Sequence, residues 1–226
     1  MTALPASAQT DEQRAGARSL ATEGVSAFNE GRFSDAAELF EKAESLVHAP
    51  THLLFLARSD AKLGRYVKAR EAYLKIVKEQ LPSTAPQAFR DAQTAADTEV
   101  RAIEPKIARL KVKLEGGQGA TDLTLKIDGD VLSAVLIGAS QPLDPGEHTV
   151  EILARGKSAA PQKVTLTEGG AAVVTLKLVD DPNAAPVPVA APGAAAPGAP
   201  PADGAPPSDA GVAKPGQGLR IASYSA

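Results

Sequence analysis

The sequence predicts a two-domain protein: a helical domain first, then a small antiparallel β-sandwich, with a disordered tail rich in Pro and Ala. Residues 11–105 are rich in Ala, Leu, Glu, Lys and Arg, and their apolar positions follow the 3.6-residue period of an α-helix. Residues 107–179 change to Val, Leu, Ile and Thr, with apolar and polar residues in alternation. Residues 180–217 are mostly Ala, Pro and Gly, which is typical of an extended linker.

Both ends of the chain leave two interpretations open. Residues 1–10 contain Ala6-Ser7-Ala8, the small-x-small pattern of a signal-peptidase site, but too few residues precede it to form a complete signal peptide. The segment is either the remnant of a signal peptide or a disordered N-terminus. Residues 218–226 become more apolar after Arg220. We expect them to begin a membrane segment that is truncated here, and the alternative is a tail without a role.

The helical domain contains an internal repeat with a period of 33 residues. Gly31-Arg32-Phe33 returns as Gly64-Arg65-Tyr66, and each triplet is flanked by helix-forming residues. The glycines lie where one helix has to end in a left-handed residue. Each triplet is followed by a small residue and then, four positions later, by an aromatic one, so two helices can pack closely. These positions are Ala36 with Phe40, and Ala69 with Tyr73.

Over residues 14–80 this pattern resembles the tetratricopeptide repeat (TPR) family in its period, turn glycine, small residue and aromatic residue. The chain departs from the family where Glu23 replaces a usual Leu and where Leu20 and Leu53 replace a usual Trp. Two repeats leave their terminal faces uncovered. We expect a fifth helix over residues 86–104, capped by Thr84, to cover the second repeat.

The β domain is predicted from six or seven short alternating segments separated by turn sequences. Asp128-Gly129 favours a tight hairpin, and Asp144-Pro145-Gly146-Glu147 favours a type II turn. Residues 108–179 are similar to the PEGA family, because Asp128-Gly129 is followed by Pro142-Leu143 and then by Pro145-Gly146-Glu147-His148. The resemblance implies a small, non-catalytic, extracytoplasmic β module. The chain departs from the family at Gly156-Lys157, where an aromatic residue is frequent.

Composition and motifs argue against several functions. The net charge of −3 and the absence of a basic block argue against a nucleic-acid binder, and the chain has no Cys. Ser59 and Lys62 have the S-x-x-K spacing of some acyl enzymes, but the companion motifs are missing. His48 and His52 lie on either side of Pro50, so we expect them not to share a metal site. We therefore expect no catalytic residue, cofactor, metal site or small-molecule substrate.

The remaining role is binding. TPR proteins use the first helix of each pair to line a concave groove, so the resemblance places the following residues there. They are Arg18, Val25, Asn29, Leu54, Arg58 and Lys62. Arg58 and Lys62 are four residues apart and would offer two positive charges on one helix face to a carboxylate of the partner. The alternative is a solvated helix face without a partner.

Together these patterns predict an exported bacterial protein of the periplasm or cell envelope, a scaffold that holds a protein or peptide partner and is tethered by residues 180–217 to a membrane anchor beyond residue 226. The alternative is a structural surface protein whose β module binds wall polysaccharide or self-assembles. The sequence names no partner, pathway or oligomeric state.

Overall fold

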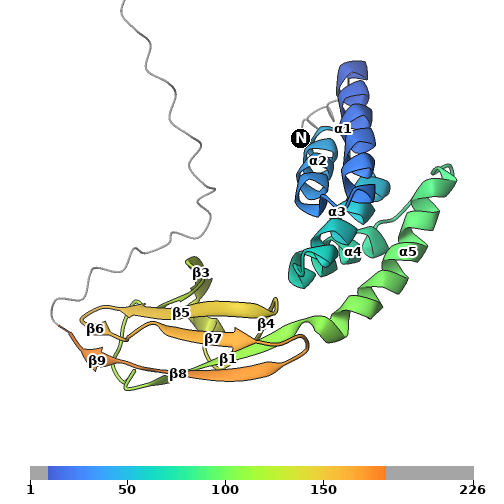
Figure 1. Ribbon diagram of the computed structural model, residues 1–226. Coiled ribbons are helices and arrows are strands. Elements are labelled where there is room, and N and C mark those ends of the chain that lie inside the picture. The colour runs from blue at the N-terminus through green and yellow to red at the C-terminus, as the bar shows by residue number, and fades with distance from the viewer. Residues whose placement is uncertain (1–9, 182–226) are drawn as a thin grey trace, which may run out of the picture. The chain divides into compact units, whose positions relative to one another are not determined.

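A computed structural model describes residues 10–181, in which five α-helices are followed by a β-sheet region (Figure 1). The predicted order of a helical domain and then a β domain is confirmed. The predictions for residues 1–9, for most of the linker and for residues 218–226 lie outside the described residues.

The helices form two hairpins and one additional helix, as the repeat predicted. Their bounds are α1 Asp11–Asn29, α2 Phe33–Leu46, α3 Pro50–Lys62, α4 Tyr66–Lys78 and α5 Gln87–Ile103. A short 3-10 turn, η1 Glu104–Lys106, follows α5 and leads into the first strand.

The two hairpin turns have the same backbone geometry. Gly31 and Gly64 adopt φ values of 78° and 75°. The amide of Arg32 donates to the carbonyl of Ala27 at 2.9 Å, and the amide of Arg65 donates to the carbonyl of Asp60, also at 2.9 Å. These are the hydrogen bonds that close a helix ending in a left-handed glycine. The sequence repeat is therefore also a structural repeat.

Helix starts differ from the prediction at one position. Pro50 occupies the first turn of α3, where its missing N–H costs nothing. Helix α5 begins after Pro86 without a side-chain cap, so the predicted cap by Thr84 is wrong. The chain does contain a capping box, but it lies at α1, where the hydroxyl of Thr10 accepts from the amide of Gln13 at 3.1 Å.

Phe40 and Tyr73 fill the interior of the two hairpins and are 1% and 2% exposed. Their small partners, Ala36 and Ala69, are fully buried. Gly24 lets Phe40 approach α1, because a Cβ atom at that position would lie 2.9 Å from the aromatic ring. Small residues at the crossing points thus allow close helix contact, as expected.

The β region contains two sheets. One sheet has the order β4-β1-β8, and the other runs β3-β2-β5-β6-β9 with β7 also paired to β5. The strands are β1 Ala108–Glu115, β2 Thr124–Ile127, β3 Asp130–Ser133, β4 Ser140–Leu143, β5 Gly146–Ala154, β6 Lys157–Ser158, β7 Gln162–Leu166, β8 Ala171–Lys177 and β9 Val179–Asp180. A second 3-10 turn, η2 Ala134–Leu136, lies between β3 and β4.

The inner faces of the two sheets share one core. Alternate residues of β1, including Leu110 and Val112, pack in one cluster with Leu125 of β2 and with Val150 and Ile152 of β5. The strand pairings within residues 10–181 are antiparallel except for that of β1 with β8, which is parallel over seven residue pairs. The sandwich prediction holds, but its purely antiparallel character does not.

The two predicted turns differ in what they connect. Asp128 and Gly129 have φ values of 54° and 90° and join β2 to β3 as a hairpin. Gly146 also has a positive φ, of 139°. Its turn, however, leads from β4 in one sheet to β5 in the other, so it forms a corner of the sandwich rather than a hairpin.

Candidate functional site

The helical region contains a hollow of about 370 Å³. Its lining comes from four helices: Phe28 of α1, Arg58, Ala61 and Lys62 of α3, Tyr73 of α4, and Glu99, Ala102 and Ile103 of α5. The lining is mainly apolar, with charged groups from α3 and α5. We call this hollow the helical groove.

An ion pair crosses the helical groove from α3 to α5. Arg58 Nε lies 3.0 Å from both carboxylate oxygens of Glu99, and Arg58 Nη2 lies 2.5 Å from Oε1. The hydroxyl of Tyr73 donates to Glu99 Oε2 at 2.8 Å. The guanidinium of Arg58 also lies over the ring of Phe55, 5.4 Å from its centre. Arg58 is therefore held on several sides by groups of its own chain.

This arrangement changes the acidity of Glu99 and of Tyr73. Partial burial opposes ionisation of Glu99, but the hydrogen bonds from Arg58 and Tyr73 prevail and lower the pKa of the Glu99 carboxyl. Burial and the neighbouring Glu99 carboxylate raise the pKa of the Tyr73 hydroxyl. At neutral pH the network thus consists of a carboxylate, a guanidinium and a neutral phenol.

Three of the six predicted partner-binding residues lie on α3, and the structure places each in a different environment. Lys62 is exposed, lines the helical groove, and has no ion pair within residues 10–181. Arg58 also lines the groove, but its charge is already neutralised by Glu99. Leu54 is 6% exposed, belongs to the helical core and does not line the groove. Periodicity alone could not distinguish the buried side of α3 from its groove side.

The other three predicted residues lie on α1 and do not line the hollow. Arg18 and Asn29 are exposed. Val25 is half-buried and packs against the cluster around Phe40. The residue that α1 does contribute is Phe28, which contacts Phe55 edge-on with 5.6 Å between ring centres. Phe28 was not predicted, although an aromatic residue one helical turn before the turn glycine is a signal that could have identified it.

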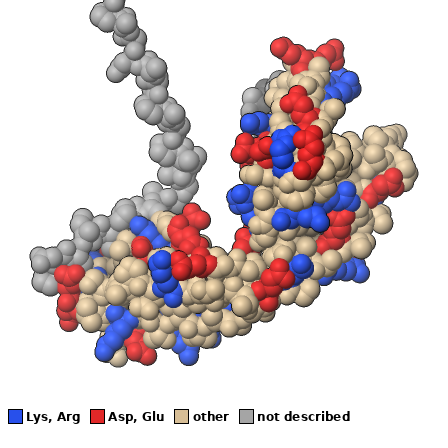
Figure 2. All heavy atoms as spheres, viewed as in Figure 1, with Lys and Arg blue, Asp and Glu red and all other residues tan. Residues whose placement is uncertain are grey.

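Glu99 is a further groove residue that the sequence did not reveal. It lies on α5, 41 residues from Arg58, and no spacing rule connects the two. Elsewhere the helical region carries charges of both signs, which are interspersed on the face shown in Figure 2. The helical groove is thus distinguished by its apolar lining and by Lys62, not by a patch of one charge.

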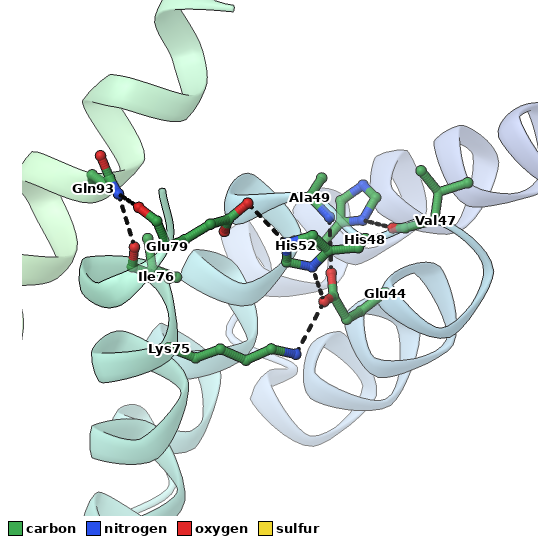
Figure 3. Close-up of polar contacts among 9 residues, drawn as sticks. All are labelled: Glu44, Val47, His48, Ala49, His52, Lys75, Ile76, Glu79 and Gln93. Atoms are coloured by element: carbon green, nitrogen blue, oxygen red, sulfur yellow. Dashed lines mark hydrogen bonds and ion pairs between the residues drawn. The ribbon is translucent and has the colours of Figure 1, made fainter. Parts of the chain in front are cut away.

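A second polar cluster joins the two hairpins at their other end (Figure 3). The ring of His48 bonds to the Glu44 carboxylate through Nδ1 and to Glu79 Oε1, 3.1 Å away, through Nε2. Lys75 Nζ lies 3.5 Å from Glu44. Burial disfavours the charged ring, but the two carboxylates outweigh it and raise the pKa of His48. The imidazole therefore links α2 to the end of α4.

His52 does not join this cluster as a ligand, because its Nδ1 lies 3.1 Å from the backbone oxygen of Val47 (Figure 3). Within residues 10–181 no group of three or more His, Asp or Glu side chains is placed to hold a metal ion. The cluster is therefore a structural link between the two repeats.

His148 connects the two turns that carry the PEGA resemblance. Its Nδ1 lies 2.6 Å from Asp128 Oδ2, and its Nε2 lies 2.8 Å from the carbonyl oxygen of Asp144. The other oxygen of Asp128 accepts from the amide of Thr149 at 2.8 Å. His148 is only 9% exposed and therefore faces the interior of the sandwich. The motif residues form one hydrogen-bonded unit that fixes the sandwich corner.

Among the helices that the structure describes, none is long and apolar enough to cross a membrane. A scan against protein-family models found no match for this chain, and a search of curated proteins found none either.

Proposed function

We propose that this chain is a non-catalytic, TPR-like scaffold protein of the bacterial cell envelope, and that its helical groove binds a peptide segment of a partner protein. The observation that carries the proposal is the apolar hollow of about 370 Å³ between α3 and α5. Apolar hollows with a few convergent polar groups are the usual form of a binding site. The groove residues offer no nucleophile beside a base, which favours binding over catalysis.

The groove residues define which peptide fits. Phe28, Ala61 and Ala102 offer an apolar surface, and Lys62 is the charge that remains available beside it. The Arg58–Glu99 pair is neutral as a unit and contributes shape rather than charge. The best-fitting ligand therefore has an apolar side chain for the hollow and a carboxylate within reach of Lys62.

Placement in the cell envelope rests on the sequence alone, through Ala6-Ser7-Ala8, the absence of Cys, the PEGA resemblance and the Pro/Ala linker. Fractionation of cells that express the native gene tests it. Recovery with the periplasm or membranes supports the proposal, and recovery with the cytosol contradicts it.

We expect a displayed peptide library screened on the full chain to yield peptides that combine an apolar and an acidic residue. Ala102→Trp fills the hollow and should weaken the best peptide by at least about tenfold, since lost burial of one apolar side chain exceeds 1.4 kcal/mol. Ala88→Trp places the same ring on an exposed part of α5 outside the lining and should leave affinity unchanged.

The role of Lys62 is tested by charge reversal. Lys62→Glu should remove the preference for acidic peptides, whereas Lys42→Glu, an exposed lysine of α2 outside the groove, should not. Equal effects of the two reversals, or enrichment of peptides without any acidic residue, would show that Lys62 does not bind a carboxylate of the peptide.

A further inference from the structure

The outer face of the sheet β4-β1-β8 carries a row of cations along its central strand. Arg109, Lys111 and Lys113 alternate with the buried residues of β1 and are all exposed. Residues two apart in a strand lie about 6.6 Å apart on the same face. Lys177 of β8 stands opposite Glu115 at the end of the row. The face therefore presents four cations and one carboxylate in a chain whose net charge is −3.

Within the described residues, the cations of this face have no charged partner. Across residues 10–181, their side chains take part in no ion pair or side-chain hydrogen bond, whereas Lys157 and Lys163 of the other sheet each pair with a carboxylate. Like charges in a row repel one another, so the arrangement stores an unfavourable interaction that an anionic partner would relieve.

Protection of a sheet edge does not account for the row. Lysines on edge strands prevent strands of separate molecules from pairing. Strand β1, however, is central, with β4 on one side and β8 on the other (Figure 1). The cations point away from the sandwich rather than guarding an open edge.

The neighbours of the row are short and partly apolar. The register places Pro142 and Ser140 of β4 beside Arg109 and Lys111. On the β8 side it places Ala171, Val173 and Thr175 beside the three β1 cations. Val173 is 57% exposed. The long cationic side chains therefore extend beyond their neighbours, around one exposed aliphatic group.

We propose that this outer face, which we call the basic face, binds the surface of a lipid bilayer that contains anionic lipids. A cation row around an exposed valine suits a charged interface with an apolar layer beneath it. Nucleic acids that bind on sheet surfaces are held by stacking on aromatic side chains, and no aromatic residue stands on these three strands. A fully hydrated acidic polymer would gain nothing from Val173.

The test measures binding of the full chain to sedimented vesicles of phosphatidylcholine, with or without about one third phosphatidylglycerol. We expect binding only to the anionic vesicles, and we expect it to weaken as salt is raised. Lys111→Gln with Lys113→Gln should lower the partition coefficient roughly 10- to 30-fold, because each cation near an anionic surface contributes about fivefold. The matched control, Lys42→Gln with Lys78→Gln, removes two exposed helical lysines and should change it less than about twofold.

Thr175→Lys provides a test that a folding defect cannot imitate. It adds a cation beside Lys113, leaves Val173 in place and should strengthen binding to anionic vesicles about fivefold. The proposal is overturned if both vesicle types bind equally, if the control pair loses as much binding as the β1 pair, or if Thr175→Lys has no effect. It is also overturned if soluble polygalacturonate or duplex DNA binds this face while the anionic vesicles do not. None of these outcomes depends on the helical groove.

Discussion

Replacing Glu99 with Ala should lower the free energy of unfolding of the helical region by about 2 kcal/mol. Removing one partner of a buried ion pair typically costs about 3–5 kcal/mol. The side chains of Arg58 and Glu99 are 32% and 30% exposed, so solvent reduces that cost. The substitution also leaves the Tyr73 hydroxyl without its acceptor. Urea unfolding followed by the helical circular dichroism signal measures the change.

Asp97→Ala is the matched control for Glu99→Ala. Asp97 lies on the same helix and pairs with Arg101 four residues away, 2.7 Å apart, but this pair is on the surface. Surface pairs of this kind contribute about 0.5 kcal/mol or less. A cost for Asp97→Ala as large as that for Glu99→Ala would show that the cross-groove pair is no more than a surface contact. A double-mutant cycle with Arg58→Ala should give a coupling energy of about 1–2 kcal/mol.

The contribution of Glu99 also has a defined dependence on pH. Because the folded state lowers the pKa of this carboxyl below its ordinary value of 4.5, the stabilisation is present above that value. It is lost as the pH falls through the lowered pKa. The difference between wild type and Glu99→Ala should therefore shrink in acid.

His148→Ala should destabilise the β region by about 2 kcal/mol, since it leaves the Asp128 carboxylate and the Asp144 carbonyl without their shared donor. Burial opposes the charged ring, but Asp128 and the Asp144 carbonyl outweigh it and raise the pKa of His148. The same pair lowers the pKa of Asp128 against the effect of its own burial. Amide hydrogen exchange of peptides from β2 and β5 reports on this region separately from the helices.

The sign of the pH dependence follows from these two shifts. Because folding raises the pKa of His148, the histidine stabilises the folded state fully when the pH is below its ordinary pKa of 6.5. That stabilisation is lost as the pH rises through the raised pKa. Because folding lowers the pKa of Asp128, the aspartate stabilises the folded state when the pH is above its ordinary pKa of 3.8. That stabilisation is lost as the pH falls through the lowered pKa. The pair of Asp128 and His148 therefore stabilises the β region most between the ordinary pKa values of 3.8 and 6.5.

In the wild type, we expect the β2 and β5 peptides to lose protection from amide hydrogen exchange as the pH rises through the raised pKa of His148. His148→Ala should abolish this pH-dependent loss. His48→Ala is the control, because the pKa of His48 is also raised but its carboxylate partners lie in the helical region. If His48→Ala removes the alkaline loss in the β peptides, or if His148→Ala leaves their protection unchanged, the proposed link between the two turns is incorrect.

Two of these features follow from local rules of sequence. In β5, His148 is in phase with Val150 and Ile152, which are buried, so strict alternation predicts an inward-facing histidine. Likewise Thr10 and Gln13 have the spacing of a capping box, which the structure confirms at α1. Local rules were sufficient for both.

Other features depend on contacts between distant segments. Arg58 meets Glu99 because the packing of α5 against α3 and α4 brings together residues 41 positions apart. The parallel pairing of β1 with β8 likewise joins the first strand of the sandwich to one near its end. Spacing within a strand or helix gives no information about either contact.

The sequence by itself determined the helical repeat, its glycine turns at Gly31 and Gly64, the β alternation and the cation row of β1. Each depends on local backbone preferences and on a fixed period of side-chain direction. Only the tertiary structure decided that Arg58 is neutralised while Lys62 remains available, and that the cation row lies on a central strand. Charge pairing and strand order are set by which surfaces pack together, and the burial of apolar area over the whole fold determines that packing.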